Sequence, residues 1–234
     1  MDSEMNQKKS MTFGYYISVI TTLLTIVTFA IAYATPPLSG PFCKANCFEY
    51  PYADIASRFP RDYYWMFFAI ILTVLYLIMM VTIHYTAKPE KKLFTHISVL
   101  FALFSTIILT TDYFIQVSVI QPSLLSGETE GIAILSQFNP HGIFIVLEEI
   151  GFISMVLSFF FLFPVFNQKN RLERTIRWTT GTGLAITISS LFLFSLIYGI
   201  KREYRFEIAV ISIAWFELIV LGILFSRYFK KSLK

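Results

Sequence analysis

Residues 63–85 have the sequence YYWMFFAIILTVLYLIMMVTIHY, and this stretch decides the fold class. It contains no Asp, Glu, Lys or Arg. At a rise of about 1.5 Å per residue, a helix of this length crosses a hydrocarbon layer of about 30 Å. Because that layer offers no water to backbone amides, a crossing segment satisfies its hydrogen bonds internally, as a helix. The stretch therefore predicts a transmembrane helix.

Five further apolar runs have similar length and composition. The six predicted helices cover residues 13–35, 63–86, 94–120, 142–166, 178–200 and 206–229. Overall, 56% of the residues are hydrophobic and 15% are charged, whereas a typical soluble domain has about 25% charged residues. We therefore expect an all-α polytopic membrane protein, built as one six-transmembrane-helix bundle that comprises residues 1–234.

The distribution of Lys and Arg predicts the orientation of this bundle. When the six helices cross in turn, thirteen of the nineteen Lys and Arg residues fall on the side that holds both termini. The positive-inside rule assigns that side to the cytoplasm. We expect a cell-membrane protein with both termini cytoplasmic and with two larger outer loops, 36–62 and 123–141. The net charge of +4 comes from these flanking residues, so the expected partner is the lipid bilayer and not nucleic acid.

The first predicted helix has a second interpretation. Lys8-Lys9, the apolar run and Ala32-Tyr33-Ala34 also resemble a cleavable signal peptide. The run is about 22 residues long, whereas the apolar core of a signal peptide is usually about 7–15 residues. We therefore expect a retained helix. Cleavage would leave five spans and an outer N-terminus.

Cys43 and Cys47 both lie in the first outer loop. In an oxidising compartment they are expected to form one local disulfide, with a redox-active pair as the alternative. The sequence has no His-Glu-x-x-His motif, no phosphate-binding glycine loop and no Gly-x-Ser-x-Gly turn. We therefore expect no metal and no cofactor.

Four acidic residues lie inside the predicted helices, namely Asp112, Glu148, Glu149 and Glu217. Such residues are costly in hydrocarbon, so they usually face the bundle interior and either bind a ligand or join helices. Asp112 lies about 13 Å below the outer end of its helix, Glu148 about 10 Å and Glu217 about 16 Å. No Lys or Arg is embedded at a matching depth. The pattern predicts an acidic cavity in the outer half of the bundle.

Two uncharged polar residues extend this predicted site. Gln116 follows Asp112 by four residues, so both share a helix face that we expect to meet an acid of the 142–166 helix. His141 precedes Glu148 by two turns, either as a pH-sensitive group at the outer mouth or as an ordinary interfacial histidine. Asn139 is expected to cap the start of the same helix. The candidate ligand-binding residues are Asp112, Gln116, His141, Glu148, Glu149 and Glu217.

The helix at 178–200 carries small residues at a spacing of four. Gly181, Ala185 and Ser189 are expected to lie on one face of this helix. Small residues allow two helix backbones to approach closely in a membrane. We therefore expect this face to pack against another helix.

The segment around the start of the 142–166 helix carries a family resemblance. Asn139-Pro140-His141-Gly142-Ile143-Phe144, Leu147-Glu148, Gly151-Phe152 and Pro164-Val165-Phe166 resemble a segment of six-helix bacterial integral membrane proteins to which no activity is assigned. The resemblance covers about thirty residues of the chain. It implies a bacterial-type inner-membrane protein, and it places Glu148 in the matching stretch.

Three functions fit these features. An acidic cavity without an embedded base favours binding or transport of a small cation, amine or proton. An intramembrane enzyme acting on a lipid or isoprenoid is the first alternative, since paired carboxyl groups can supply an acid and a base. A structural or sensor protein that acts through partners is the second. We expect binding or transport rather than catalysis, and the sequence leaves the ligand and the oligomeric state open.

Overall fold

The computed structural model describes residues 2–167 and 170–233. Within these ranges the regular elements are all helical, and six helices are long and apolar enough to cross a membrane. These are α1 (Asp2–Ala34), α2 (Tyr64–Thr86), α3 (Lys92–Ile115), α6 (Ile143–Phe160), α7 (Arg171–Tyr198) and α8 (Tyr204–Ser232). The prediction of an all-α fold with six long apolar helices is confirmed.

Short helical turns fill the connections between the long helices. They are η1 (Gly40–Phe42), η2 (Ala53–Arg58), η3 (Arg61–Tyr63), η4 (Pro89–Lys91), α5 (Ile132–Leu135) and η6 (Gly199–Lys201). After α3 the chain stays helical through a π-helical turn, η5 (Gln116–Ile120), and through α4 (Gln121–Leu125).

Helices α1 and α7 begin earlier than predicted, at Asp2 and Arg171. Two further predicted helix ends are wrong, and proline is involved in both. The third long helix was expected to stop at Gln121-Pro122, but the chain stays helical there, and Pro122 lies in α4 directly after the π-helical turn η5. The fourth was expected to reach Phe166, but α6 ends at Phe160. The chain then tightens into turns that lead to Pro164, such as the bond from Leu162 N to Phe159 O.

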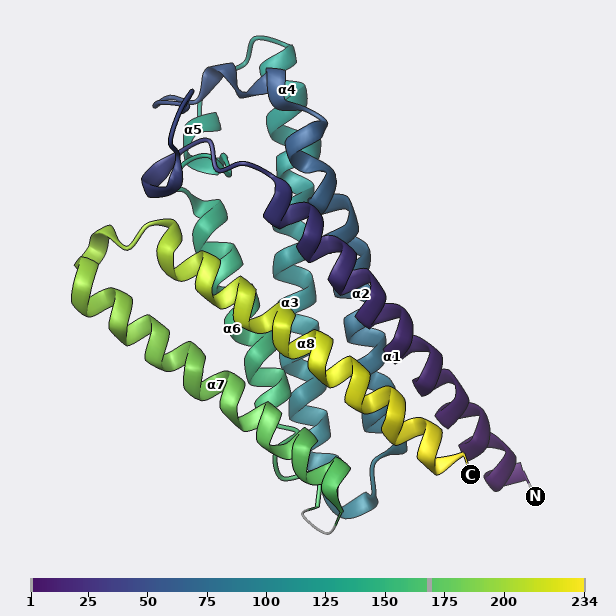
Figure 1. The fold of residues 1–234 in the computed structure, drawn as a ribbon. Helices are drawn as coiled ribbons and strands as arrows, with labels where there is room; N and C mark the ends of the chain where they lie inside the picture. The colour runs from purple at the N-terminus through teal and green to yellow at the C-terminus, as the bar shows by residue number, and fades with distance from the viewer. Residues whose placement is uncertain (1, 168–169, 234) are drawn as a thin grey trace.

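Figure 1 shows how the helices are arranged. Helix α8 lies beside α1 and also contacts α6 and α7, while α3 packs against α2 and α6. The start of α1 and the end of α8 lie at one end of the bundle, which we call the terminal end. The loops that contain η1, η2, α4 and α5 gather at the opposite end, which we call the loop end (Figure 1).

Glycines allow close approach at two of these helix contacts. A Cβ added to Gly151 of α6 would lie 2.5 Å from Leu109 Cδ2 of α3. A Cβ added to Gly222 of α8 would lie 2.1 Å from Thr22 Oγ1 of α1. Both values are well inside van der Waals contact, so these positions hold the helix pairs α3–α6 and α1–α8 close together.

Helix α7 lies at the edge of the bundle and packs along one narrow face. The expected packing face was wrong, because Ala185 and Ser189 are exposed. The buried positions are instead Ile176, Thr180, Gly183 and Thr187. The packing face is therefore rotated from Gly181 to Gly183, which lies against an acidic side chain of α8.

Candidate functional site

Two buried carboxyl groups from different helices lie near the loop end. Glu148 lies in the second turn of α6 and is 0% exposed, while Glu207 lies in the first turn of α8 and is 7% exposed. Glu148 is close enough for its charge to act on Glu207.

Helix α3 adds an acid and a phenol to this pair. Tyr113 donates its hydroxyl to Glu148 Oε1 at 2.9 Å. Asp112 is buried and close enough for its charge to act on both Glu148 and Glu207. We call Asp112, Glu148 and Glu207 the acid cluster. Among the described residues, no Lys, Arg or His forms an ion pair with any of the three.

Each member of the acid cluster keeps an unused oxygen. Within residues 2–167 and 170–233, one carboxyl oxygen of each acid is buried without a hydrogen-bond partner; these are Asp112 Oδ2, Glu148 Oε2 and Glu207 Oε2. A buried polar atom without a partner costs about 1–3 kcal/mol. Three such atoms in one region indicate a site that accepts a donor or a cation.

Glu149 departs from the expectation that the embedded acids have no basic neighbour. Arg202, just after η6, donates to Glu149 Oε2 through Nη2 at 2.7 Å and to Oε1 through Nε at 3.4 Å. The expectation failed because Arg202 lies outside the apolar run, and its long side chain reaches down to the acid. Glu149 is therefore neutralised and does not belong to the acid cluster.

Gln116 lies in the π-helical turn. It was expected to meet an acid of α6, but its side chain binds backbone groups instead. Its Nε2 donates to Leu135 O at 2.7 Å, and its Oε1 accepts from Gln137 N at 3.0 Å. The amide thus pairs with both an acceptor and a donor of the loop-end backbone. Gln116 positions the segment that follows α5.

His141 is placed on the surface and not at the acid cluster. Its side chain is 66% exposed, and Nε2 lies 3.9 Å from Glu203 Oε1. The expected cap by Asn139 was wrong, because α6 begins at Ile143 with Gly142 as its N-cap, and Asn139 Oδ1 accepts from His141 N instead.

Glu217 lies apart from the acid cluster. It follows Glu207 by ten residues on α8, which is about 15 Å along the helix axis. It is 4% exposed, and in the described part of the chain neither of its carboxyl oxygens has a hydrogen-bond partner. Gly183 of α7 leaves room for it, because a Cβ there would lie 1.9 Å from Glu217 Oε2. The structure thus separates Glu217 from the other predicted acids.

A cavity of about 450 Å³ opens beside the acid cluster. Glu207 forms part of its wall. The other residues that line it are mainly apolar and come from the end of α1, the segment after α1, the start of α2, the connection between α5 and α6, and the first four turns of α8. They include Phe29, Tyr33, Phe42, Trp65, Phe138, Tyr204, Ile208, Ile211 and Trp215. The second acid in the wall, Asp62, is paired with Arg58 at 2.6 Å.

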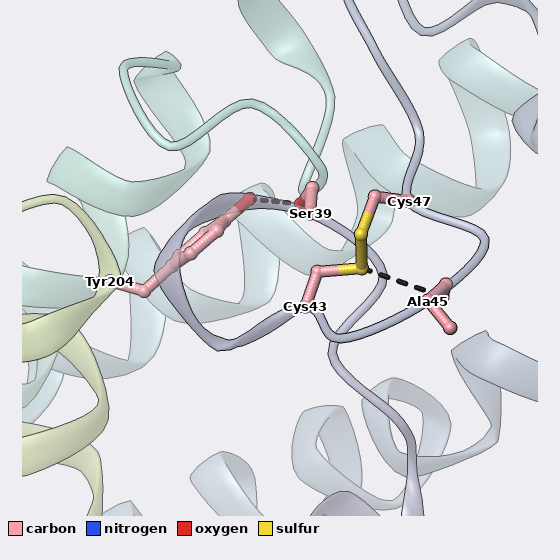
Figure 2. Close-up of a disulfide and its surroundings, with 5 residues drawn as sticks. All are labelled: Ser39, Cys43, Ala45, Cys47 and Tyr204. Carbon is pink, nitrogen blue, oxygen red and sulfur yellow. Dashed lines mark hydrogen bonds between the residues drawn. A yellow bond between two sulfur atoms is a disulfide. The ribbon is translucent and has the colours of Figure 1, made fainter.

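The segment after α1 covers the cavity at the loop end. Ser39 Oγ and the Tyr204 hydroxyl lie 2.8 Å apart, and the hydroxyl also donates to Gln137 O at 3.0 Å. Figure 2 shows this contact next to the disulfide that joins Cys43 and Cys47. The bridge closes a short loop directly after η1, so it lies beside the cavity roof.

The same loop reaches the connection between α7 and α8. Burial raises the pKa of the Tyr52 hydroxyl, and the negative charge of Glu203 adds to this rise. Glu203 directly precedes α8, whose first turns line the cavity. The loop of residues 36–62 and the start of α8 are therefore in electrostatic contact.

The sequence-based reasoning missed Glu207, Tyr113 and Arg202. Glu207 was overlooked because it lies one residue inside the predicted start of its helix, where an acid is usually solvated. Its spacing held the missing signal, since Glu207, Val210, Ala214 and Leu218 fall on one helix face and the last three are apolar. All four are buried in the structure.

The arrangement is chemically suited to a proton or to an organic cation. Among the described residues, no group of three or more His, Cys, Asp or Glu side chains is placed to hold a metal ion. No family model, no curated protein and no solved structure matches the chain.

Proposed function

We propose that this chain is a multi-pass cell-membrane protein that binds a small amphiphilic cation, such as an organic amine, in the cavity at its loop end. The observation that carries this proposal is Glu207. Its carboxyl group is buried in the wall of an otherwise mainly apolar cavity, and it forms no ion pair among the described residues. A cationic group with an apolar body complements both parts of this surface.

Aromatic rings beside the carboxyl group support a cationic ligand. The rings of Trp65 and Trp215 have centroids 6.3 Å apart, and Phe29 lies 5.6 Å from Trp215. All three line the cavity. Aromatic faces attract cations within about 6 Å, and an organic ammonium benefits most because its hydration shell is weak. The volume of about 450 Å³ lies within the range of small-molecule sites.

The cavity rim supports entry from the side of the bundle. Tyr33, Phe42 and Ile208 line the cavity and are also exposed, Tyr33 at 88%. Tyr33 lies in the last turn of α1, while Ile208 lies in the first two turns of α8. An amphiphile dissolved in the surrounding lipid would meet this rim with its apolar body first.

The proposed orientation places the loop end outside the cytoplasm. The excess of Lys and Arg at the other side supports this orientation through the positive-inside rule. The disulfide at the loop end supports it independently, because disulfides persist in oxidising compartments. In this orientation the cavity faces the outer leaflet of the cell membrane.

The enzyme alternative is less well supported. Glu207 could exchange a proton with a substrate, but the cavity offers few groups that would orient a reaction. Its lining is mainly apolar, and Asp62 is already held by Arg58. Reversible binding requires only the features that are present.

The proposal can be tested with two tryptophans of the site itself. Trp65 and Trp215 line the cavity, and the third tryptophan, Trp178, is exposed on α7. In a Trp178→Phe background, fluorescence of detergent-purified protein is titrated with phenylbutylamine and with phenylbutanol, which differ in charge. We expect saturable quenching by both, with tighter binding of the amine.

The matched pair of variants is Glu207→Gln and Glu217→Gln, which remove carboxyl groups from the same helix. Loss of a charge-assisted contact costs about 1.5–3 kcal/mol, so Glu207→Gln should weaken amine binding by roughly 10–100-fold and leave phenylbutanol unaffected. Glu217→Gln should leave both affinities unchanged. Equal affinity for amine and alcohol in the unmodified site would refute the proposal.

A further inference from the structure

We propose that the ligand of this cavity is a lipid with a primary ammonium headgroup, whose hydrocarbon chain leaves the cavity between α1 and α8 and extends into the bilayer. The inference rests on the proposed function and specifies the class of amphiphile that the same site binds. It follows from the way in which α1 and α8 separate toward the loop end.

Helices α1 and α8 pack tightly between the terminal end and the middle of the bundle. A Cβ added to Gly222 of α8 would lie 2.1 Å from Thr22 Oγ1 of α1, and one added to Gly14 of α1 would lie 2.7 Å from Phe229 Cε1 of α8. Both distances are far below van der Waals contact. No hydrocarbon chain can therefore pass between the two helices at these contacts.

The same two helices separate toward the loop end, as Figure 1 shows. Within α1, Thr28 is the last buried residue, and none of the residues 29–34 is buried. Residues of both helices line the cavity here. They are Phe29, Ala32 and Tyr33 of α1 and Tyr204, Glu207, Ile208, Ile211, Ser212 and Trp215 of α8. The cavity therefore extends between the last turns of α1 and the first turns of α8.

The opening between these turns is apolar. Tyr33 is 88% exposed and Ile208 is 43% exposed, and both line the cavity. Among the lining residues of α1 and α8, Glu207 is the charged one. In the orientation proposed above, this opening faces the outer half of the bilayer. A hydrocarbon chain that passes through it stays among apolar groups and needs no room inside the cavity.

The positions of Glu207 and Ile208 set the direction of the bound lipid. These neighbours project about 100° apart around α8. Glu207 is 7% exposed and therefore faces the bundle, whereas the more exposed Ile208 faces the opening. An ammonium group at Glu207 would thus have its chain directed past Ile208 toward the lipid.

Glu207 also favours a primary ammonium group as the head. Within the described part of the chain, its Oε2 is buried and has no hydrogen-bond partner. A primary ammonium group carries three N–H donors, whereas a quaternary one carries none. The primary group can therefore supply both the charge and the missing hydrogen bond.

The separation of the helices distinguishes a lipid from a short amine. Two helices that separate give up packing contacts, and such contacts hold helices together in a membrane. A short amine would be enclosed better if α1 and α8 touched along their whole length. A lipid requires the opening, because its chain is longer than its binding cavity.

The test measures how binding depends on chain length. Full-length Trp178→Phe protein is placed in nanodiscs of phosphatidylcholine, whose quaternary headgroup has no N–H donor. Primary alkylamines from hexylamine to octadecylamine, and the alkanols of the same lengths, compete with phenylbutylamine in the fluorescence titration. We expect every amine to compete, and octadecylamine to bind roughly 10–100-fold more tightly than octadecanol.

Ala32→Phe and Ala34→Phe form a matched pair of variants in the last turn of α1. Ala32 lines the cavity, whereas Ala34 is exposed and lies outside the lining. Ala32→Phe narrows the opening, so it should weaken octadecylamine binding roughly tenfold and change phenylbutylamine binding by less than about threefold. Ala34→Phe should leave both affinities unchanged.

The outcomes separate the two proposals. Absence of saturable phenylbutylamine binding would refute the proposed function and the lipid assignment with it. If phenylbutylamine binds but the longest amines do not compete, the cavity is closed toward the bilayer and the lipid assignment alone is overturned. Equal binding of octadecylamine and octadecanol would overturn the ammonium headgroup. An unchanged octadecylamine affinity in Ala32→Phe would overturn the path between α1 and α8.

Discussion

The ion pair between Glu149 and Arg202 should stabilise the loop end of the bundle measurably. Two donor contacts, at 2.7 and 3.4 Å, join these side chains, and the pair links α6 to the start of α8. The side chain of Glu149 is 9% exposed and that of Arg202 is 34% exposed. This setting is intermediate between a solvated surface pair, worth about 0.2–1 kcal/mol, and a buried pair, whose breakage costs about 3–5 kcal/mol.

From these limits we expect a coupling energy of about 2 kcal/mol between the two side chains. Four proteins measure it: the wild type, Arg202→Met, Glu149→Gln and the double variant. Arg202→Met should be the most harmful, because it leaves a buried carboxylate without a counter-charge. Adding Glu149→Gln should recover part of that loss, since a neutral amide needs no counter-charge.

The assay is thermal unfolding in detergent, followed by tryptophan fluorescence. In a chain of this size, about 2 kcal/mol corresponds to a shift in melting temperature of roughly 4–8 °C. A recovery of several degrees in the double variant over Arg202→Met is the expected result. If the two single effects add within about 0.5 kcal/mol, the residues do not interact and the pairing is refuted.

Three further changes test other contacts. Gly183→Ala places a Cβ 1.9 Å from Glu217 Oε2, so it should lower the free energy of unfolding by about 1–3 kcal/mol. Combining it with Glu217→Ala should remove that clash, and thermal unfolding of the two variants measures the difference. Replacing Cys43 and Cys47 by Ser should lower the free energy of unfolding by up to about 2 kcal/mol, because the bridge closes a very short loop. Adding a reductant to the wild type should lower its melting temperature by the same amount. Gln116→Leu leaves a backbone carbonyl and an amide of the loop end unpaired, so it should cost about 1–3 kcal/mol and increase hydrogen exchange after α5; unchanged exchange would contradict the assigned role.

Hydropathy predicted the long helices because each of them is set by a local property of the chain. An apolar run of sufficient length specifies a spanning helix without reference to its neighbours. The same local rules failed at Pro122 and Pro164, where the backbone conformation depends on which turn of a helix the proline occupies. Single prolines therefore shifted helix ends without changing the number of long helices.

The candidate site was only partly predictable, because its composition depends on how the helices rotate. Asp112 and Glu148 were identified as embedded acids, and the structure brings them near each other. Glu207 joins them from a position that hydropathy treats as a boundary, and Arg202 reaches Glu149 from outside the apolar run. Long side chains and helix rotation are tertiary properties, so pattern alone could not assign these partners.

The most direct test of the proposed cavity is to locate the ligand by photolabelling. An aryl-azide derivative of phenylbutylamine is irradiated with the full-length protein in detergent, and labelled peptides are identified by mass spectrometry. Labelling at Phe29, Trp65 or Trp215, blocked by excess phenylbutylamine and reduced in Glu207→Gln, is the result that our account predicts. Labelling confined to the exposed face of α7, or labelling that excess amine does not block, would contradict it.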